Sequence, residues 1–292
     1  MLLLFLIFVW GASWPIYKLA LPYTPPILFA GMRATIGGLL LAIILFNKRD
    51  KIKWSENWRL YCISALLNTT LFFGIQTVGL NYLPGGLFSI LVYFQPVLLG
   101  LFAWIWLGEF MTPGKIIGLL IGFIGIIIVS LDGLTFHVSV LGVVLGLMSA
   151  FFWALGVIYV KKVSHQVNAF WMVSMQCIIG GFVLIVFGGF FEDFSDIVWN
   201  SEYIGALSYG SILGIPLAQI VYYKLIREGE ASKVGSFTFM VPIIAVILGA
   251  VFLDEPITYL LIIGLVLVGI SIFIVNYRSK KKLIDYSSVE NS

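Results

Sequence analysis

Ten polar or aromatic side chains stand inside long apolar stretches of the sequence. They are Trp10, Ser13, Trp14, Arg33, Asn68, Gln76, Tyr93, Gln95, Trp153 and Gln219. In hydrocarbon each polar group needs a partner, which is either a neighbouring helix or the water and solute of a cavity. Taken singly, each residue favours hydrogen bonding between helices. Taken together, they are able to line a cavity for a small, neutral or zwitterionic, partly apolar solute.

The sequence lacks the groups needed for covalent, metal or nucleotide chemistry. Cys62 and Cys177 lie inside apolar stretches without paired spacing, and His137 and His165 lie at the ends of such stretches. This set supplies neither a disulfide framework nor a ligand set for zinc or haem. No HExxH, GxSxG or GxxxxGKS/T motif is present. We therefore expect no enzyme activity, no ATP-driven pumping, no cofactor, no metal site and no nucleic-acid partner.

Arg33 is the one strong charge placed well inside an apolar stretch. It lies about six residues, or ~9 Å at a rise of 1.5 Å per residue, from the nearer end of that stretch. One interpretation is a side chain that snorkels outward or bonds to backbone carbonyls. The other is a contact with the carboxylate of a bound solute. The sequence is compatible with both.

Composition identifies the elements that hold these residues. Of the 292 residues, 61% are hydrophobic and 11% are charged, and the mean hydropathy is +1.06. Soluble domains carry about 25% charge, and a helix needs about 20 apolar residues to cross a membrane. The sequence predicts an all-α integral membrane protein with ten transmembrane helices. Their predicted limits are 2–19, 27–46, 58–80, 84–107, 114–131, 138–160, 168–191, 202–226, 231–253 and 257–276.

The sequence repeats itself at two fixed offsets. Adding 146 carries Pro96 to Pro242, Glu109 to Glu255, Thr112 to Thr258 and Gly118 to Gly264. Adding 143 carries Trp10 to Trp153, Lys18 to Lys161, Arg33 to Gln176 and Gly37–Gly38 to Gly180–Gly181. The repeat predicts two five-helix halves, residues 1–133 and 134–277, followed by a basic tail at 278–292. Because five is odd, the halves enter the membrane from opposite sides and form an inverted repeat.

Basic residues predict the orientation of the chain. With a cytoplasmic N-terminus, all but two of the 17 Lys and Arg residues fall in cytoplasmic segments, and the exceptions are Lys18 and Arg33. Orientation follows the position of Lys and Arg in short loops. We therefore expect both termini in the cytoplasm and the acidic 192–201 loop outside.

Two pairs of repeated residues are candidates for moving parts. Pro96 and Pro242 lie inside predicted helices, where proline removes a backbone hydrogen bond and kinks the helix. Each is either a fixed kink for packing or a hinge. Glu109 and Glu255 precede Thr112 and Thr258 at predicted turns. They either stabilise the start of the next helix or close gates at opposite ends of the molecule.

The repeated phrases carry a resemblance to a known family. "QPVLLGLFAWIWLGEFMTPGKIIGLLIGFIGI" begins at Gln95, and "VPIIAVILGAVFLDEPITYLLIIGLVLVGISI" begins at Val241. A proline, a small and apolar run, an acidic residue at a turn and a glycine-spaced helix resemble the EamA family of the drug/metabolite transporter superfamily. The resemblance implies a multi-pass permease of the bacterial inner (plasma) membrane, usually an exporter of amino acids or other small metabolites. The lipid bilayer and a small-molecule substrate are the partners it implies, and a homodimer is a candidate assembly.

The inverted repeat independently favours a transporter, since two similar halves in opposite orientation exchange inward-open and outward-open states around a central site. A channel-like, receptor or structural multi-span protein is the alternative. All 14 acidic residues lie in loops, at the ends of predicted helices or in the tail. Proton exchange through a central carboxylate is therefore disfavoured, and we expect facilitated diffusion down the gradient of the substrate.

Overall fold

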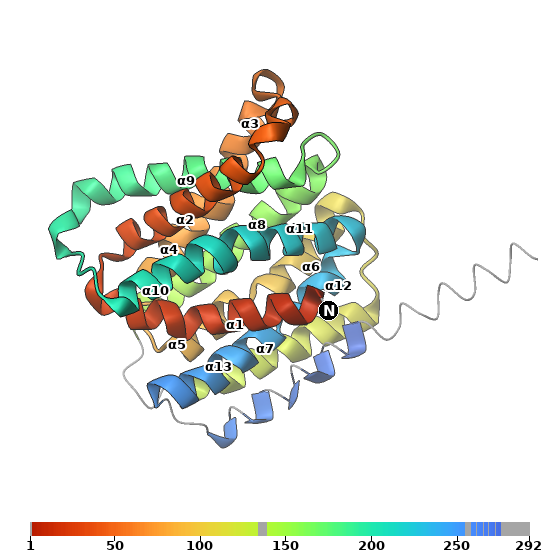
Figure 1. The fold of residues 1–292 in the computed structure, drawn as a ribbon. Coiled ribbons are helices and arrows are strands. Elements are labelled where there is room, and N and C mark those ends of the chain that lie inside the picture. Colours follow the sequence, from red (N-terminus) through yellow and green to blue (C-terminus); the bar gives the residue numbers. More distant parts are fainter. Residues whose placement is uncertain are drawn as a thin grey trace, which may run out of the picture.

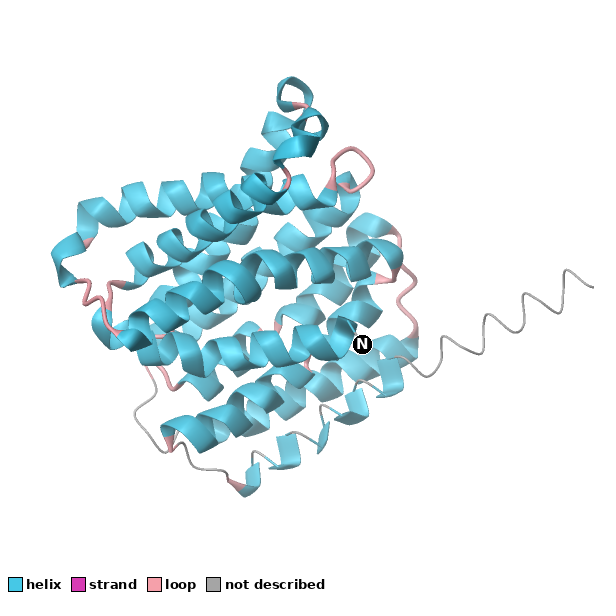
Figure 2. Ribbon diagram, in the orientation of Figure 1, coloured by secondary structure: helices cyan, strands magenta, loops and turns pink. Residues whose placement is uncertain are grey.

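The structure is a computed structural model that describes residues 2–133, 139–254, 258–260, 262–264, 266–267, 269–271 and 273–275. His137, Glu255 and the predicted tail at 278–292 lie outside the described residues. Within the described part every regular element is a helix (Figure 2), as the composition predicts. The helices run roughly side by side, with the connecting loops at the two ends of the bundle (Figure 1).

The elements follow one another along the chain with short connections. They are α1 (Leu2–Ala20), η1 (Leu21–Tyr23), α2 (Pro26–Ile44), η2 (Phe46–Ile52), α3 (Trp54–Ala65), η3 (Leu66–Leu71), α4 (Phe72–Gly79), α5 (Gly85–Val92), α6 (Gln95–Leu107), α7 (Pro113–Gly133), α8 (Val140–Val163), α9 (Ala169–Phe191), η4 (Phe194–Asp196), α10 (Ser201–Tyr209), η5 (Gly210–Leu217), α11 (Ala218–Glu228), α12 (Ala231–Thr238) and α13 (Met240–Leu253).

Eight helical stretches in the described part are long and apolar enough to cross a membrane. They are Leu2–Tyr23, Pro26–Ile44, Trp54–Gly79, Gly85–Leu107, Val140–Val163, Ala169–Phe191, Ser201–Glu228 and Lys233–Leu253. They coincide with eight of the ten predicted spans. The fifth predicted span coincides with α7, Pro113–Gly133. The tenth corresponds to the helical stretch Ile262–Val275, in which positions 265, 268 and 272 lie outside the described residues.

The outer surface of the bundle is apolar. Phe190 is 79% exposed, Ile44 is 77% exposed and Phe252 is 68% exposed, and many further Leu, Ile, Val and Phe side chains are exposed on the same elements. The interior instead holds buried polar side chains, among them Arg33 and Gln176. This distribution suits hydrocarbon outside and hydrogen-bonding partners inside.

Four of the eight spans are irregular in their middle. The segments η3 and η5 are π-helical and interrupt the spans α3–α4 and α10–α11. The span α5–α6 breaks at Tyr93 and Phe94, and the span α12–α13 breaks at Phe239. A π-helical turn inserts a residue into the α-helical pattern and changes the direction of the side chains that follow. These breaks therefore set the orientation of the side chains in the middle of the bundle.

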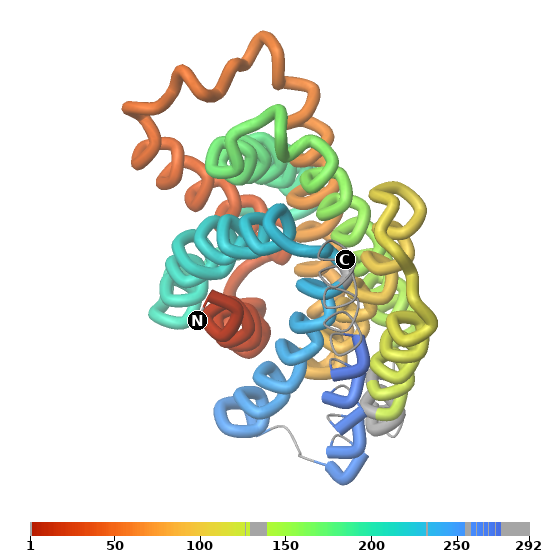
Figure 3. The backbone as a smooth tube through the Cα atoms, turned by 90° about the vertical axis from the view of Figure 1, so that its right-hand side faces the viewer, coloured from red at the N-terminus to blue at the C-terminus, as the bar shows by residue number. Residues whose placement is uncertain are grey.

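Helix α2 packs along α9 through glycine residues, and α1 lies between α13 and the span α10–α11 (Figure 3). A Cβ atom built on Gly181 would lie 2.6 Å from Thr35 N and 2.9 Å from Gly31 O of α2. The missing side chain lets the two backbones approach closely, as in other membrane helix pairs. Close packing of α2 on α9 thus depends on Gly181.

We predict that Gly181→Ala destabilises the protein by about 1–3 kcal/mol, because the new methyl group collides with backbone atoms that cannot rotate away. The matched control is Gly205→Ala in α10, where an added Cβ would meet nothing within 4 Å. Alanine favours a helix over glycine by about 1 kcal/mol, so the control should be neutral or stabilising. Thermal unfolding in detergent measures both, and equal melting temperatures for the two variants would contradict the close approach of α2 and α9.

Candidate functional site

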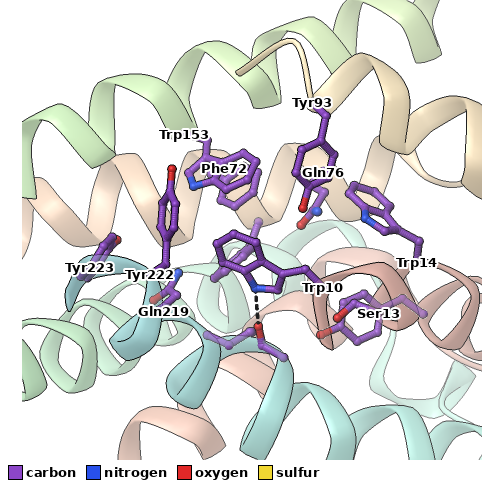
Figure 4. A pocket seen from close by; sticks show the side chains of 14 residues that line it. Trp10, Ser13, Trp14, Phe72, Gln76, Tyr93, Trp153, Gln219, Tyr222 and Tyr223 are labelled. Carbon is purple, nitrogen blue, oxygen red and sulfur yellow. Dashed lines mark hydrogen bonds between the residues drawn. The ribbon is translucent and has the colours of Figure 1, made fainter. Parts of the chain in front are cut away.

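A cavity of about 40 Å³ lies in the middle of the bundle, where α1, α4, α8, α11, η5 and the break at Tyr93 meet (Figure 4). This volume has room for a few water molecules. Its lining residues are Trp10, Ser13, Trp14, Tyr17, Phe72, Phe73, Gln76, Tyr93, Trp153, Gly214, Ile215, Gln219, Tyr222 and Tyr223. We call this site the central pocket. None of these lining residues carries a formal charge at neutral pH.

Aromatic rings form most of the wall, and Trp153 is their common contact. Its ring lies 5.3 Å from Trp10 and 5.4 Å from Tyr93, both edge to face, and 5.0 Å from Phe72 in a stacked arrangement. Tyr222 in turn lies 5.0 Å from Trp10. Edge-to-face contacts of this kind are favourable beyond the area they bury. The wall offers ring faces and edges to an apolar, aromatic or ammonium group.

Polar groups lie at the edge of the same pocket. Trp10 Nε1 donates to Gly214 O at 3.2 Å, which ties α1 to the π-helical segment η5 (Figure 4). Ser13 Oγ donates to Val9 O at 2.9 Å. Gln76 Oε1 is buried and has no hydrogen-bond partner among the described residues. The pocket thus keeps an unpaired acceptor on an otherwise aromatic wall.

A hydrogen-bonded network lies behind the pocket and is centred on Gln176 of α9. Gln176 Nε2 donates to Gln219 Oε1 at 2.6 Å and to Tyr223 Oη at 3.2 Å, and Gln176 Oε1 accepts from Ser64 Oγ at 2.5 Å. Asn68 Nδ2 donates to Ser64 Oγ at 3.3 Å. This network joins α3, η3, α9 and α11. It therefore couples the positions of these elements to Gln219 and Tyr223, which line the pocket.

Seven of the ten residues singled out in the sequence line the pocket, and three lie one layer behind it. Asn68 belongs to the Gln176 network. Gln95 lies behind Tyr222, with its Nε2 3.5 Å from Tyr222 Oη. Arg33 lies behind Tyr17 and is 1% exposed, so it does not snorkel to the surface. These three side chains support the pocket wall and do not form it.

Several lining residues escaped the sequence analysis, although helical spacing identifies them. Trp10, Ser13, Trp14 and Tyr17 stand at positions i, i+3, i+4 and i+7 of α1, which is one face of a helix. Gln219, Tyr222 and Tyr223 follow the same rule in α11. A search for helical neighbours of Ser13 and Gln219 would have included Tyr17, Tyr222 and Tyr223.

Two lysines, one at each end of the bundle, connect the end of a helix to a neighbouring loop. At one end Lys18 Nζ donates to Leu80 O at 2.6 Å and Leu83 O at 3.1 Å. The C-terminal ends of α1 and α8 lie at opposite ends of the bundle (Figure 1). Near the end of α8, Lys161 Nζ lies 2.9 Å from Glu109 Oε1 and donates to Gly229 O at 2.9 Å. We call these the Lys18 contact and the Lys161 contact. Each holds the end of one helix against the loop between two others.

Glu109 has a second partner, which bears on its predicted role at a turn. Its Oε1 also accepts from Ala231 N at 2.7 Å, at the start of α12. Thr112 Oγ1 accepts from Lys115 N at 3.3 Å and so caps α7. Glu109 connects the loop before α7 to α8 and to the start of α12.

The two candidate hinge prolines lie directly after helix breaks. Pro96 is the second residue of α6 and Pro242 is the third residue of α13. The sequence analysis placed them in the interior of continuous helices, where they would remove a hydrogen bond. In the structure each lies in the first turn of a half-helix, where the missing N–H has no helical partner to lose. The break precedes the proline and is not a kink around it.

Glu230 anchors a charge cluster beside the Lys161 contact. Its carboxylate lies 2.6 Å from Lys115 Nζ and 2.6 Å from Lys233 Nζ, and Lys115 is buried. Partial burial raises the pKa of Glu230, but the hydrogen bonds and charges of Lys115 and Lys233 outweigh this effect and leave the pKa below its ordinary value. Ionised Glu230 therefore stabilises the fold.

These features define a class of protein: an all-helical, multi-span membrane protein with an uncharged aromatic pocket at its centre. The particular family follows from comparison with known proteins. The model of the EamA-like transporter family matches residues 1–131 and 140–277, and the chain belongs to this family.

Individual relatives agree with this assignment. "Uncharacterized transporter YvbV" of Bacillus subtilis (strain 168) is 49% identical over 280 residues, which cover 96% of this chain and 92% of that protein. "Uncharacterized transporter YoaV" of the same organism is 27% identical, over 94% of this chain and 95% of that protein. A solved crystal structure matches the fold with a TM-score of 0.77 at 18% identity and covers 96% of both chains. Relatives named as transporters suggest a protein that is not an enzyme.

We predict that Glu230→Gln lowers the melting temperature at neutral pH by roughly 2–4 °C, because it leaves Lys115 buried with a weaker partner. The pKa of Glu230 is lower in the folded chain than in the unfolded chain, so its contribution is present above the unfolded pKa and is lost as pH falls through the folded pKa. The difference between wild type and variant should therefore shrink below about pH 4.5.

Glu56→Gln is the matched control, since the Lys53–Glu56 pair is also spaced by three residues but is exposed at both partners. It should leave the melting temperature unchanged at every pH. A pH-independent effect of Glu230→Gln, or an equal effect of Glu56→Gln, would show that the charge of Glu230 is not what stabilises this region.

Proposed function

We propose that the protein is a secondary transporter that exports amino acids or related small metabolites across the bacterial cell membrane by alternating access. The observation that carries this proposal is the central pocket, which lies between two ends that are each fastened by a lysine contact. An uncharged aromatic pocket suits a small, partly apolar solute. Releasing one end at a time would open the pocket to one side of the membrane and then to the other.

Two inverted five-helix halves, residues 1–133 and 134–277, would provide the two states. Supporting this, the family model matches in two segments, and the helix breaks at Tyr93 and Phe239 differ by the repeat offset of 146. Both halves also carry a π-helical segment in their third helix, η3 and η5. Halves of similar structure and opposite orientation have open states of similar energy. In this proposal both termini and the 278–292 tail lie in the cytoplasm, and the distribution of Lys and Arg supports that orientation.

The lysine contacts obey the same repeat. Lys18 and Lys161 differ by 143, and the carbonyls they bind, Leu83 and Gly229, differ by 146. In the proposed orientation the Lys18 contact closes the outer side, and the Lys161 contact with Glu109 closes the cytoplasmic side. Glu255, the repeat equivalent of Glu109, is the proposed outer gate residue.

The helix breaks are the proposed hinges. Pro96 and Pro242 lie in the first turn of their half-helices, where a proline removes no α-helical hydrogen bond, so in this proposal the angle at each preceding break can change. Transport in this scheme is facilitated diffusion, because no carboxylate lines the central pocket to carry a proton. A channel or receptor with the same fold is the competing function.

Counterflow distinguishes a carrier from a channel or receptor. Proteoliposomes are loaded with an unlabelled mixture of the common amino acids and diluted into one labelled amino acid at a time. We predict that the loaded vesicles take up at least one labelled amino acid several times faster than empty vesicles, and that Trp153→Ala, which removes the common contact of the aromatic wall, reduces this exchange at least tenfold. Uptake at the same rate in loaded and empty vesicles would indicate a channel. If none of the labelled amino acids is taken up, amino acids are not the substrates.

The gate assignment is tested by access to a cysteine placed in the pocket. Ser13→Cys is introduced together with Cys62→Ala and Cys177→Ala, and a membrane-impermeant maleimide is applied to either side of the membrane. We predict faster labelling from the cytoplasmic side with Lys161→Met and from the outside with Lys18→Met, because each removes one contact that holds an end closed. Lys53→Met, in an exposed ion pair, is the control. If neither Lys161→Met nor Lys18→Met changes the labelling rate, the two lysine contacts are not gates. If each variant is labelled faster from the side opposite to the predicted one, the proposed orientation is wrong.

A further inference from the structure

Arg33 of α2 is buried without the partners that its charge requires. The side chain is 1% exposed, and Nη2 donates to Thr77 Oγ1 at 2.7 Å. Nε and Nη1 are buried and have no hydrogen-bond partner among the described residues. A guanidinium carries five N–H donors, and an unsatisfied, desolvated donor on a charged group is costly. Such a group inside a membrane protein is an indication of a functional site.

The surroundings of Arg33 hold no counter-ion within the described residues. Its Cζ atom lies 4.1 Å from the ring centre of Tyr17, 5.2 Å from that of Phe29 and 5.5 Å from that of Phe73. Thr77 of α4 accepts a hydrogen bond from Nη2, and Gly210 of η5 faces the Arg33 stem, since a Cβ there would lie 3.2 Å from Cδ. Four elements thus meet the cation with rings, a hydroxyl and a glycine. Ring faces attract a cation but leave its N–H donors free.

Arg33 is separated from the central pocket by a single layer. Tyr17 and Phe73, whose rings contact the guanidinium, both line the pocket. The Tyr17 hydroxyl rests against the backbone of η5, because a Cβ on Gly210 would lie 3.2 Å from it. The ring of Tyr17 is therefore held by packing on a π-helical segment, where the helix is irregular. A rotation of this one side chain would bring the free N–H groups of Arg33 into contact with a solute in the pocket.

We propose that Arg33 binds the carboxylate of the transported solute, with Tyr17 as the side chain that covers it in the empty pocket. The inference rests on the proposed transport function and names the class of substrate: a monoanion or zwitterion with a carboxylate and an apolar or aromatic body. The free N–H groups of a guanidinium match a carboxylate. The described lining of the pocket adds no second cation to Arg33, and one positive charge balances one negative charge, which favours a carboxylate over a doubly charged phosphate. The aromatic wall takes the apolar body, or the ammonium group of a zwitterion.

Binding to purified protein in detergent tests the charge directly, with Trp fluorescence and thermal unfolding as the readouts. The probes are phenylacetate, its neutral isostere phenylacetamide, phenyl phosphate and inorganic phosphate. We expect phenylacetate to bind and stabilise the protein, and each of the other three to bind at least tenfold more weakly. Equal binding of phenylacetamide would show that the site does not recognise a carboxylate. Tighter binding of phenyl phosphate or inorganic phosphate would show that the site prefers a phosphate. If phenylacetate does not bind, the inference is refuted.

Two variants link this binding to Arg33. Arg33→Gln removes the charge and keeps a donor for Thr77, and the second half accommodates glutamine at the repeat-equivalent position, Gln176. It should weaken phenylacetate binding at least tenfold and bring it to the level of phenylacetamide. Arg33→Lys keeps the charge and should retain an intermediate affinity for the acid. Unchanged phenylacetate binding in Arg33→Gln, with a normal melting curve, would overturn the inference. If Arg33→Gln does not fold, Arg33→Lys decides the question. Loss of its preference for phenylacetate over phenylacetamide would show that binding depends on the guanidinium, and an undiminished preference would contradict this dependence.

The two proposals fail in different ways. If wild-type proteoliposomes show counterflow and Arg33→Gln shows it equally well, transport stands and the carboxylate site is wrong. If counterflow is absent for every amino acid while phenylacetate binds in an Arg33-dependent manner, the anion site stands and transport of amino acids is wrong.

Discussion

Water is absent from the hydrocarbon interior of a membrane, so every polar group in the middle of this bundle has to find its partner within the protein or in the water and solute of a cavity. Gln176 shows the first solution, since its amide contacts Ser64 of α3 and Gln219 and Tyr223 of α11. Arg33 and Gln76 show the other, because each keeps atoms without a partner in the described structure. Unsatisfied atoms also occur behind the pocket, on Asn68 and Gln95, but Arg33 is the one of these four residues that carries a charge.

The irregular helices also provide hydrogen-bond partners for polar groups inside the bundle. The carbonyl of Gly214 in the π-helical η5 accepts a hydrogen bond from Trp10 of the neighbouring α1. The breaks before Pro96 and after Thr238 likewise fall in the interior of spans. Glycines at Gly31 and Gly181 bring α2 and α9 close together elsewhere. Rigid glycine-packed helices and irregular ones around the pocket are thus two parts of one bundle.

The fold was largely predictable because a helix that crosses a lipid bilayer must be both long enough and apolar enough, and the sequence shows both properties directly. Eight of the ten predicted spans are long apolar helices in the described part of the chain, and the fifth coincides with α7. The site was predictable at positions such as Trp10, Ser13 and Trp14, which share one helical face. Asn68 and Gln95 were expected at the cavity and lie behind it, since the rotation of a helix about its axis depends on its neighbours and is shifted further by η3 and the break at Tyr93.

The small volume of the central pocket has a kinetic consequence. About 40 Å³ holds a few waters, so a solute of amino-acid size enters only after several rings have changed position. Part of the interaction energy is then consumed by this rearrangement, and the apparent dissociation constant rises in proportion to the rarity of the open arrangement. Weak retention shortens the time that a solute stays bound, because differences in affinity between related complexes reside mostly in the off-rate. A pocket that closes on itself when empty thus favours rapid turnover at high solute concentration over tight capture at low concentration.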